Sequence, residues 1–146
     1  MIRVATINDL DIIVRNNILL AKETENLDLD ESIVQKGVKK IITDKTKGSY
    51  FLYLIDDVII GQTLITYEWS DWRNKDFWWV QSVYVNINNR NQKVFKNLFN
   101  YLVNLAKDLD SCGIKLYVDQ NNLIAKNSYA SLGLKLSHYE LYELYF

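Results

Sequence analysis

Hydrophobic and polar residues along the chain follow strand spacing and helix spacing in turn. Strands are predicted for residues 2–6, 49–69, 77–85, 114–118 and 137–146. Asp56 and Asp57 divide the second of these segments into two runs, which predicts a hairpin. The segment 77–85 is almost continuously apolar, which is typical of a central strand that is covered on both faces.

Helical spacing of apolar residues, together with start and stop signals, marks the segments between these strands. Helices are predicted from Thr6 to about Ala21, from Asp30 past Ile42, from Val94 to Leu109 and from Asn122 to Leu132. Thr6, Asp30 and Asn122 suit N-cap positions, and Gly133 suits a helix stop. The order of elements, β-α-α-β-β-β-α-β-α-β, predicts an α/β (α+β) fold in which helices cover both faces of a mixed sheet.

Length and composition fit a single domain that spans residues 1–146, since 49% hydrophobic residues are enough for a packed core. The net charge of -1 opposes a nucleic-acid partner. No apolar run reaches the roughly 20 residues that a membrane helix needs, so no membrane partner is expected.

One cysteine, Cys112, excludes an intrachain disulfide and favours a cytoplasmic location. A single histidine, His138, gives little support to a metal site, and none is predicted.

Two stretches carry candidate chemistry. The helix start at residues 90–96 combines exposed backbone N–H groups with Arg90, Lys93 and Lys96, which suits an anion, although a solvated basic helix start is the plainer interpretation. Farther along, Asn122 and Tyr129 lie two helical turns apart, on one side of a helix that follows a strand end. A tyrosine in such a crevice can donate a proton, whereas the plainer interpretation has Tyr129 in the core and Asn122 as a cap.

Carboxylates and aromatic residues gather in two loops. Glu68 lies beside Trp69, close to Asp71 and Trp72, and the connector at residues 23–31 is strongly acidic. Carboxylates next to aromatic rings suit a cationic amine, although most charges in loops are simply solvated.

The order of elements and two motifs resemble the GNAT superfamily of acyl-CoA-dependent N-acyltransferases, and the likeness covers nearly the whole chain. The phosphate motif of that family, Q/R-x-x-G-x-G/A, falls on residues 90–95. Arg90 matches this motif, while Lys93 and Phe95 replace its small residues. A later motif of the family is matched by Asn122, Ala125, Tyr129 and Gly133.

Asn127 and the segment 66–85 are similar to the diamine (spermidine/spermine) acetyltransferase branch of this superfamily. That branch usually carries a glutamate where this chain has Gln81, which cannot act as a base. Because an alkyl amine with a pKa of about 10.4 must lose a proton before it attacks, Glu68 is the substitute candidate. A water chain or an acceptor amine of lower pKa are the alternatives.

The resemblance implies that the strands at 77–85 and 114–118 splay apart at a bulge and hold the pantetheine arm of acetyl-CoA between them. Tyr129 would protonate the departing thiolate after direct attack by the amine. The implied cofactor-binding residues are Val83, Tyr84, Val85, Arg90, Asn91, Gln92, Lys93, Val94, Phe95, Lys96, Asn122, Asn127 and Tyr129. The implied acceptor-binding residues are Gln81, Glu68, Trp69 and Trp72.

The sequence therefore predicts an N-acetyltransferase that moves an acetyl group from acetyl-CoA to the primary amine of a small molecule. The alternative is a GNAT-fold module that binds CoA or a partner without turnover, because Lys93 and Gln81 depart from the family pattern. Antibiotics, polyamines, amino acids and protein N-termini all remain open as acceptors. The aromatic tail at 137–146 is predicted to pair or pack across a homodimer. If Lys93 has a positive φ, it carries backbone strain; with helical dihedrals it carries none.

Overall fold

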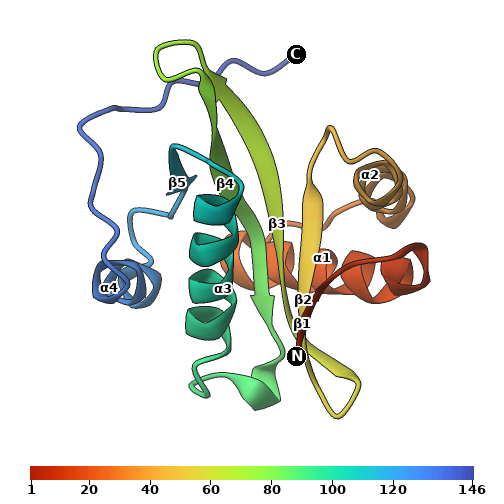
Figure 1. Cartoon of the computed structure of the whole chain (residues 1–146). Helices are drawn as coiled ribbons and strands as arrows, with labels where there is room; N and C mark the ends of the chain where they lie inside the picture. The colour runs from red at the N-terminus through yellow and green to blue at the C-terminus, as the bar shows by residue number, and fades with distance from the viewer.

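A computed structural model describes residues 1–146 and contains one five-stranded sheet (Figure 1). The strands are β1 (Ile2–Val4), β2 (Ser49–Ile55), β3 (Val58–Ser70), β4 (Lys75–Val85) and β5 (Gly113–Leu116). They lie side by side in chain order, antiparallel from β1 to β4, and only β5 runs parallel to its neighbour β4. The predicted mixed, mostly antiparallel sheet is confirmed.

Helices cover both faces of this sheet, as the element order predicts (Figure 1). The helices are α1 (Leu10–Glu25), α2 (Glu31–Thr43), α3 (Val94–Asp108) and α4 (Leu123–Ser131), and short 3₁₀ turns occupy Ile7–Asp9 and Ile87–Asn89. Two separate clusters form the core: α1 and α2 pack on one face of the sheet and α3 on the other. On α3, Leu98 and Leu102 are almost fully buried, in agreement with its apolar stripe.

Asp30 caps α2 as predicted, whereas a 3₁₀ turn follows the predicted cap Thr6 and α1 begins only at Leu10. The Asp30 carboxylate accepts hydrogen bonds from the backbone N–H groups of Ser32 and Ile33 at the start of α2. Before α1, Asp9 accepts from the backbone N–H of Thr6 and makes a bidentate pair with the Arg3 guanidinium. This guanidinium and the Thr6 donors lower the pKa of Asp9 to about 2, even though burial acts in the opposite direction.

The pairing of β4 changes along its length, and this change opens the sheet. Ser82 and Val83 together face Thr63 of β3, which is a β-bulge, and Ser82 has a positive φ of 48°. On the other side of β4, pairing with β5 ends at Val80 and Leu116. The two strands diverge beyond that point, so the predicted splay between them is confirmed.

The predicted strand at 137–146 does not form. The chain beyond α4 has no helix or strand, and its large side chains stay exposed, with Leu144 at 80% and Tyr145 at 81%. Alternation predicts a strand only where a partner strand supplies hydrogen bonds, and the tail pairs with no strand of its own chain. The open edge of β5 therefore stays without a neighbour.

Candidate active site

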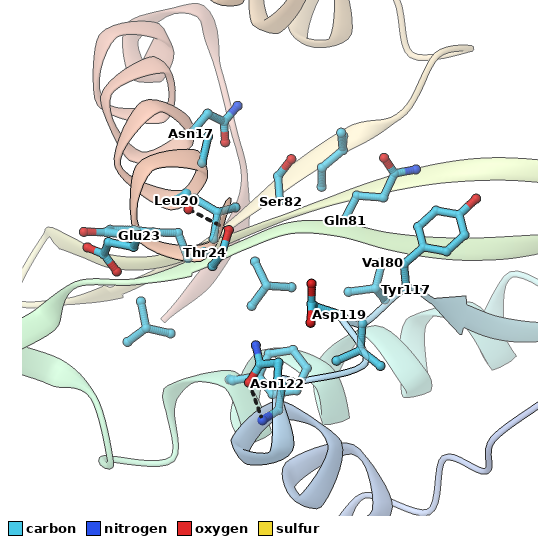
Figure 2. Close-up of a pocket in the computed structure, with 18 of the residues that line it drawn as sticks. Asn17, Leu20, Glu23, Thr24, Val80, Gln81, Ser82, Tyr117, Asp119 and Asn122 are labelled. Carbon is cyan, nitrogen blue, oxygen red and sulfur yellow. Dashed lines mark hydrogen bonds between the residues drawn. The ribbon is translucent and has the colours of Figure 1, made fainter. Parts of the chain in front are cut away.

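A cleft of about 1600 Å³ opens along the splayed part of the sheet. Its floor is the end of β4, residues 80–85, and one side is formed by α1 and α2. The other side is formed by the start of α3, the loop after β5 and α4. In Figure 2, Asn17 and Leu20 of α1 face this cleft from above β4, and Asn122 faces it from below.

The segment of residues 90–96, called here the amide turn, brings free backbone donors to the cleft. None of the amide groups of residues 91–96 donates a hydrogen bond within the protein, and the first to do so is Asn97, to the Lys93 carbonyl at 2.9 Å. Asn91 and Lys93 both have positive φ, 65° and 62°, whereas Arg90, Gln92 and Val94 do not. Such alternation turns successive N–H groups toward one concave side, which is an anion-binding geometry. The turn therefore fits the phosphates of a nucleotide cofactor.

The positive φ of Lys93 answers the question that the sequence left open. Lys93 is the N-cap of α3 and has φ 62° and ψ 18°, the left-handed region that glycine adopts without cost. A lysine there keeps the shape of the turn, carries backbone strain and adds a cation at the cleft.

Arg90 reaches across the mouth of the cleft. Its guanidinium donates to the Glu23 carboxylate at the end of α1, and its Nε donates to the Val85 carbonyl at 3.1 Å. The same guanidinium lies 5.7 Å from the centre of the Tyr84 ring. Gln92 donates instead to the Asn88 carbonyl, outside the residues that line the cleft.

Tyr129 lines the cleft from α4, held against α3 by an aromatic contact. Its ring centre is 5.6 Å from that of Phe95, which itself packs on Phe99, so Phe95 lies under the turn as its apolar spacing predicts. Burial raises the pKa of the Tyr129 hydroxyl, which keeps its proton in place at neutral pH. Asn122 caps α4 through the Ala125 amide and also lines the cleft, whereas Asn127 does not.

The residues predicted to bind the acceptor are not brought together. Gln81 lines the cleft and donates to the Thr66 hydroxyl at 2.6 Å. Glu68 lies outside the cleft, where it accepts from Trp79 Nε1 at 2.7 Å and pairs with Lys115 at 3.0 Å. Lys115, followed by Trp79, lowers the pKa of Glu68, which makes its carboxylate a weaker base.

The two predicted tryptophans also lie outside the cleft lining. Trp69 and Trp72 are 60% and 84% exposed at the turn between β3 and β4, and neither belongs to the residues that line the cleft. The carboxylates that do line the cleft are Glu23, Glu25 and Asp119. Figure 2 shows Asp119 on the loop after β5, with its carboxylate pointing into the cleft.

Sequence reasoning missed a network of neutral polar side chains between α1 and the sheet. Gln62, which is fully buried, accepts from Asn16 and donates to Asn17, each at 2.9 Å. Asn17 in turn donates to the Tyr50 hydroxyl at 2.9 Å, beside the bulge at Ser82. The signal was present, because Asn16 and Asn17 interrupt the apolar stripe of a helix and Gln62 interrupts an apolar strand.

The fold and this cleft define a class of proteins, and comparisons with known proteins agree with it. Residues 18–134 match the acetyltransferase (GNAT) family. The chain belongs to this family of acetyltransferases. None of the curated proteins matches the sequence.

Solved structures similar to this chain include a possible acetyltransferase from Clostridium difficile 630. It is 44% identical, with a TM-score of 0.95, over 100% of this chain and 97% of that one. A predicted acetyltransferase from Clostridium acetobutylicum, solved with acetyl-CoA, is 17% identical, with a TM-score of 0.80, over 99% and 95%. An aminoglycoside acetyltransferase from a soil metagenome is 17% identical, with a TM-score of 0.77, over 100% and 95%. The last two are similar in fold alone.

Proposed function

We propose that the protein transfers the acetyl group of acetyl-CoA to the primary amine of a small molecule, by direct attack in a ternary complex. The observation that carries this proposal is the amide turn, with free donors at residues 91–96 that face the same cleft as Tyr129. The acetyl-CoA in the solved Clostridium acetobutylicum structure supports the same cofactor for this fold.

The chain offers a separate partner for each part of acetyl-CoA. The amides of residues 91–96 would bind the pyrophosphate, with Lys93 and Lys96 adding charge. The edge of β4 from Val83 to Val85 has no strand on its β5 side, so its backbone groups are available to the pantetheine amides. Bound acetyl-CoA supplies the thioester that the amine attacks.

Tyr129 would supply the proton that the departing thiolate needs. Tyr129 lines the cleft, and because burial raises its pKa above the ordinary tyrosine value, its hydroxyl carries a proton at neutral pH that it can donate. Asn122 holds the first turn of α4 through its cap, and thereby the helix that carries Tyr129.

The amine must lose a proton before it attacks, and this step needs a base. Gln81 cannot accept a proton, and the ion pair of Glu68 with Lys115 opposes the role that the sequence suggested for it. Asp119 lines the cleft, although its carboxylate also accepts the Asn121 amide at 2.7 Å. If Asp119 is the base, Asp119→Asn lowers turnover at neutral pH while Glu68→Gln leaves it unchanged; the reverse result would return the role to Glu68.

A non-catalytic module that binds CoA is the second candidate, and the absence of a glutamate at Gln81 favours it. Both candidates should bind acetyl-CoA, but only the enzyme should transfer its acetyl group to an amine. Purified protein would be tested first by thermal shift with acetyl-CoA, where ligand at 100 times its Kd adds about 2.7 kcal/mol of stability. Release of free CoA would then be followed with a panel of amines. A thermal shift without turnover on any amine selects the module, and no shift at all refutes both candidates.

The C-terminal tail supports a homodimer. Residues 137–146 alternate like a strand but pair with nothing, and the edge of β5 is open. Beside that edge lies a small apolar groove whose lining includes Phe99, Val103 and Ile114. A partner's tail that pairs with β5 would bury both surfaces. Sedimentation of the full chain and of a chain ending at Lys135 tests this, since only the full chain should dimerise.

No helix in the structure combines the length and the apolar character needed to cross a bilayer. A cytoplasmic location remains a prediction from the single cysteine.

A further inference from the structure

The side of the cleft formed by α1 and α2 differs in character from the side that faces the amide turn. Apart from polar residues of α1, this side is apolar, and its large aliphatic residues are called here the apolar wall: Leu20, Leu27, Leu29, Ile33, Val34 and Ile41. Leu27 and Ile33 are 47% and 67% exposed, although both line a concave surface. Concave apolar surface that no part of the chain covers is typical of a ligand pocket.

The charged residues between positions 27 and 41 do not line the cleft. Residues 27–41 include the acidic residues Asp28, Asp30 and Glu31 and three lysines, yet every cleft-lining residue in this range is uncharged. Asp28 pairs with Lys22 at 3.0 Å, and Asp30 caps α2. Of the acidic connector at residues 23–31, only Glu23 and Glu25 line the cleft, at the end of α1, and Glu23 is paired with Arg90. Its other carboxylates lie outside the cleft lining.

Neutral polar groups lie where the wall meets β4. Asn17 and Tyr50 line the cleft there, together with Gln81 and Ser82 at the bulge. Asn17 and Tyr50 are already joined by a hydrogen bond of 2.9 Å, which fixes the position of the Tyr50 hydroxyl. This junction offers hydrogen bonds to an amine without offering it a counter-charge.

We infer that the acceptor is a primary amine carried on an apolar body, which packs on the apolar wall while the amine lies at the Asn17–Tyr50 junction. This inference rests on the proposed acetyl transfer and narrows its substrate class. It opposes a diamine or an aminoglycoside, because a second ammonium group would have to leave water for an uncharged surface.

Gly37 marks the place where the wall has room. It lies on α2 among the wall residues and lines the cleft, and a Cβ built on it would meet nothing within 4 Å. A side chain at this position would therefore start from open space at the cleft. Replacing Gly37 would also restrict the backbone of the unfolded chain and so favour the helix.

A homologous series of amines tests the inference directly. With acetyl-CoA saturating, kcat/KM for propyl-, butyl-, pentyl- and hexylamine should rise about fourfold for each added methylene until the wall is filled. Hexylamine should exceed 1,6-diaminohexane by at least tenfold, since the two differ mainly in the distal ammonium. A flat series, or a preference for the diamine or for spermidine, would overturn the inference while leaving acetyl transfer intact.

Two pairs of variants separate the wall from the fold. Gly37→Leu should lower kcat/KM for hexylamine about tenfold or more and keep acetyl-CoA affinity, whereas Gly37→Ala should change either value less than threefold. Ile33→Asp should reduce the preference for hexylamine over the diamine. Lys39→Gln, the same charge change on a residue of α2 that does not line the cleft, should leave that preference unchanged.

Equilibrium binding gives a readout that does not depend on turnover. In the presence of CoA, calorimetry should detect hexylamine binding that Gly37→Leu weakens about tenfold, and weaker binding of 1,6-diaminohexane. Equal binding of the two amines contradicts the apolar wall. Failure of acetyl-CoA itself to bind is a different outcome, because it refutes the proposed function on which the inference rests.

Discussion

Lys93 gives the sharpest test of the amide turn, because its left-handed backbone conformation strains a lysine but not a glycine. A residue with a Cβ in the left-handed region costs about 1–2 kcal/mol, and Lys93 has φ 62°. Lys93→Gly removes this cost but adds about 0.5–1 kcal/mol of backbone entropy to the unfolded chain. We expect the variant to be more stable by about 0.5–1 kcal/mol, which is a rise in Tm of about 2–3 °C for a chain of this size.

Alanine variants isolate the strain from the charge. Lys93→Ala removes the same charge as Lys93→Gly and keeps the Cβ, so at this position glycine should be more stable than alanine. Lys96 lies in the first turn of α3, where the backbone is helical. At that position alanine should be more stable than glycine by about 0.5–1 kcal/mol. Urea unfolding of the four variants measures both differences.

The sign of the glycine–alanine difference decides the question. If alanine is the more stable residue at both positions, Lys93 carries no strain and the left-handed turn is refuted. Acetyl-CoA affinity follows a separate rule, because Lys93→Ala loses a cation near the pyrophosphate and should bind about twofold to fivefold more weakly. Lys93→Gly should recover part of that loss, since the backbone can approach more closely.

The remaining predictions concern three other sites. Asp9→Asn should cost about 2 kcal/mol at pH 7, because the Arg3 pair lowers the pKa of Asp9 from 3.8 to about 2. A carboxylate with a lowered pKa stabilises the fold only while it is ionised, so the difference in unfolding free energy between variant and wild type should disappear as the pH falls from about 4 to 2. A difference that persists in urea unfolding at pH 2 would contradict this. Glu23→Gln frees the Arg90 guanidinium for phosphate, so calorimetry should record acetyl-CoA binding about twofold to fivefold tighter; weaker binding would mean that the ion pair holds the turn in its binding shape. Tyr129→Phe should lower kcat by about 100-fold or more with acetyl-CoA affinity kept, while Tyr101→Phe, outside the cleft, retains activity; a Tyr129→Phe enzyme with normal kcat would exclude the general-acid role.

Most elements could be predicted because their signals are local. Asp30 and Asn122 cap the helices that follow them, and the apolar stripe of α3 faces the core. The amide turn was found for the same reason, since it follows a buried strand and precedes an amphipathic helix. The sign of φ at Lys93 could not be predicted, because the residue type does not decide between a right-handed and a left-handed backbone conformation; the surrounding chain does.

The surroundings of Glu68, Trp69 and Trp72 could not be predicted from the sequence, because they depend on contacts between distant residues. Local composition grouped Glu68 with two tryptophans, but pairing of β3 with β4 places them in or beside the exposed end of this hairpin, outside the cleft lining. The side of the cleft opposite the amide turn is lined by residues of α1, α2 and β2, which meet only in the folded chain. The tail at 137–146 failed for a related reason, since a strand needs a partner that its own sequence does not supply.

We propose above that the free amides of residues 91–96 bind the pyrophosphate of acetyl-CoA in the cleft that Tyr129 also lines. The most direct test is a titration of isotope-labelled protein with acetyl-CoA, followed by the amide proton shifts. We expect saturable downfield shifts, largest at residues 91–96 and accompanied by changes along residues 81–85, as new hydrogen bonds form. Saturable binding that leaves the amides of residues 91–96 unshifted would contradict the account.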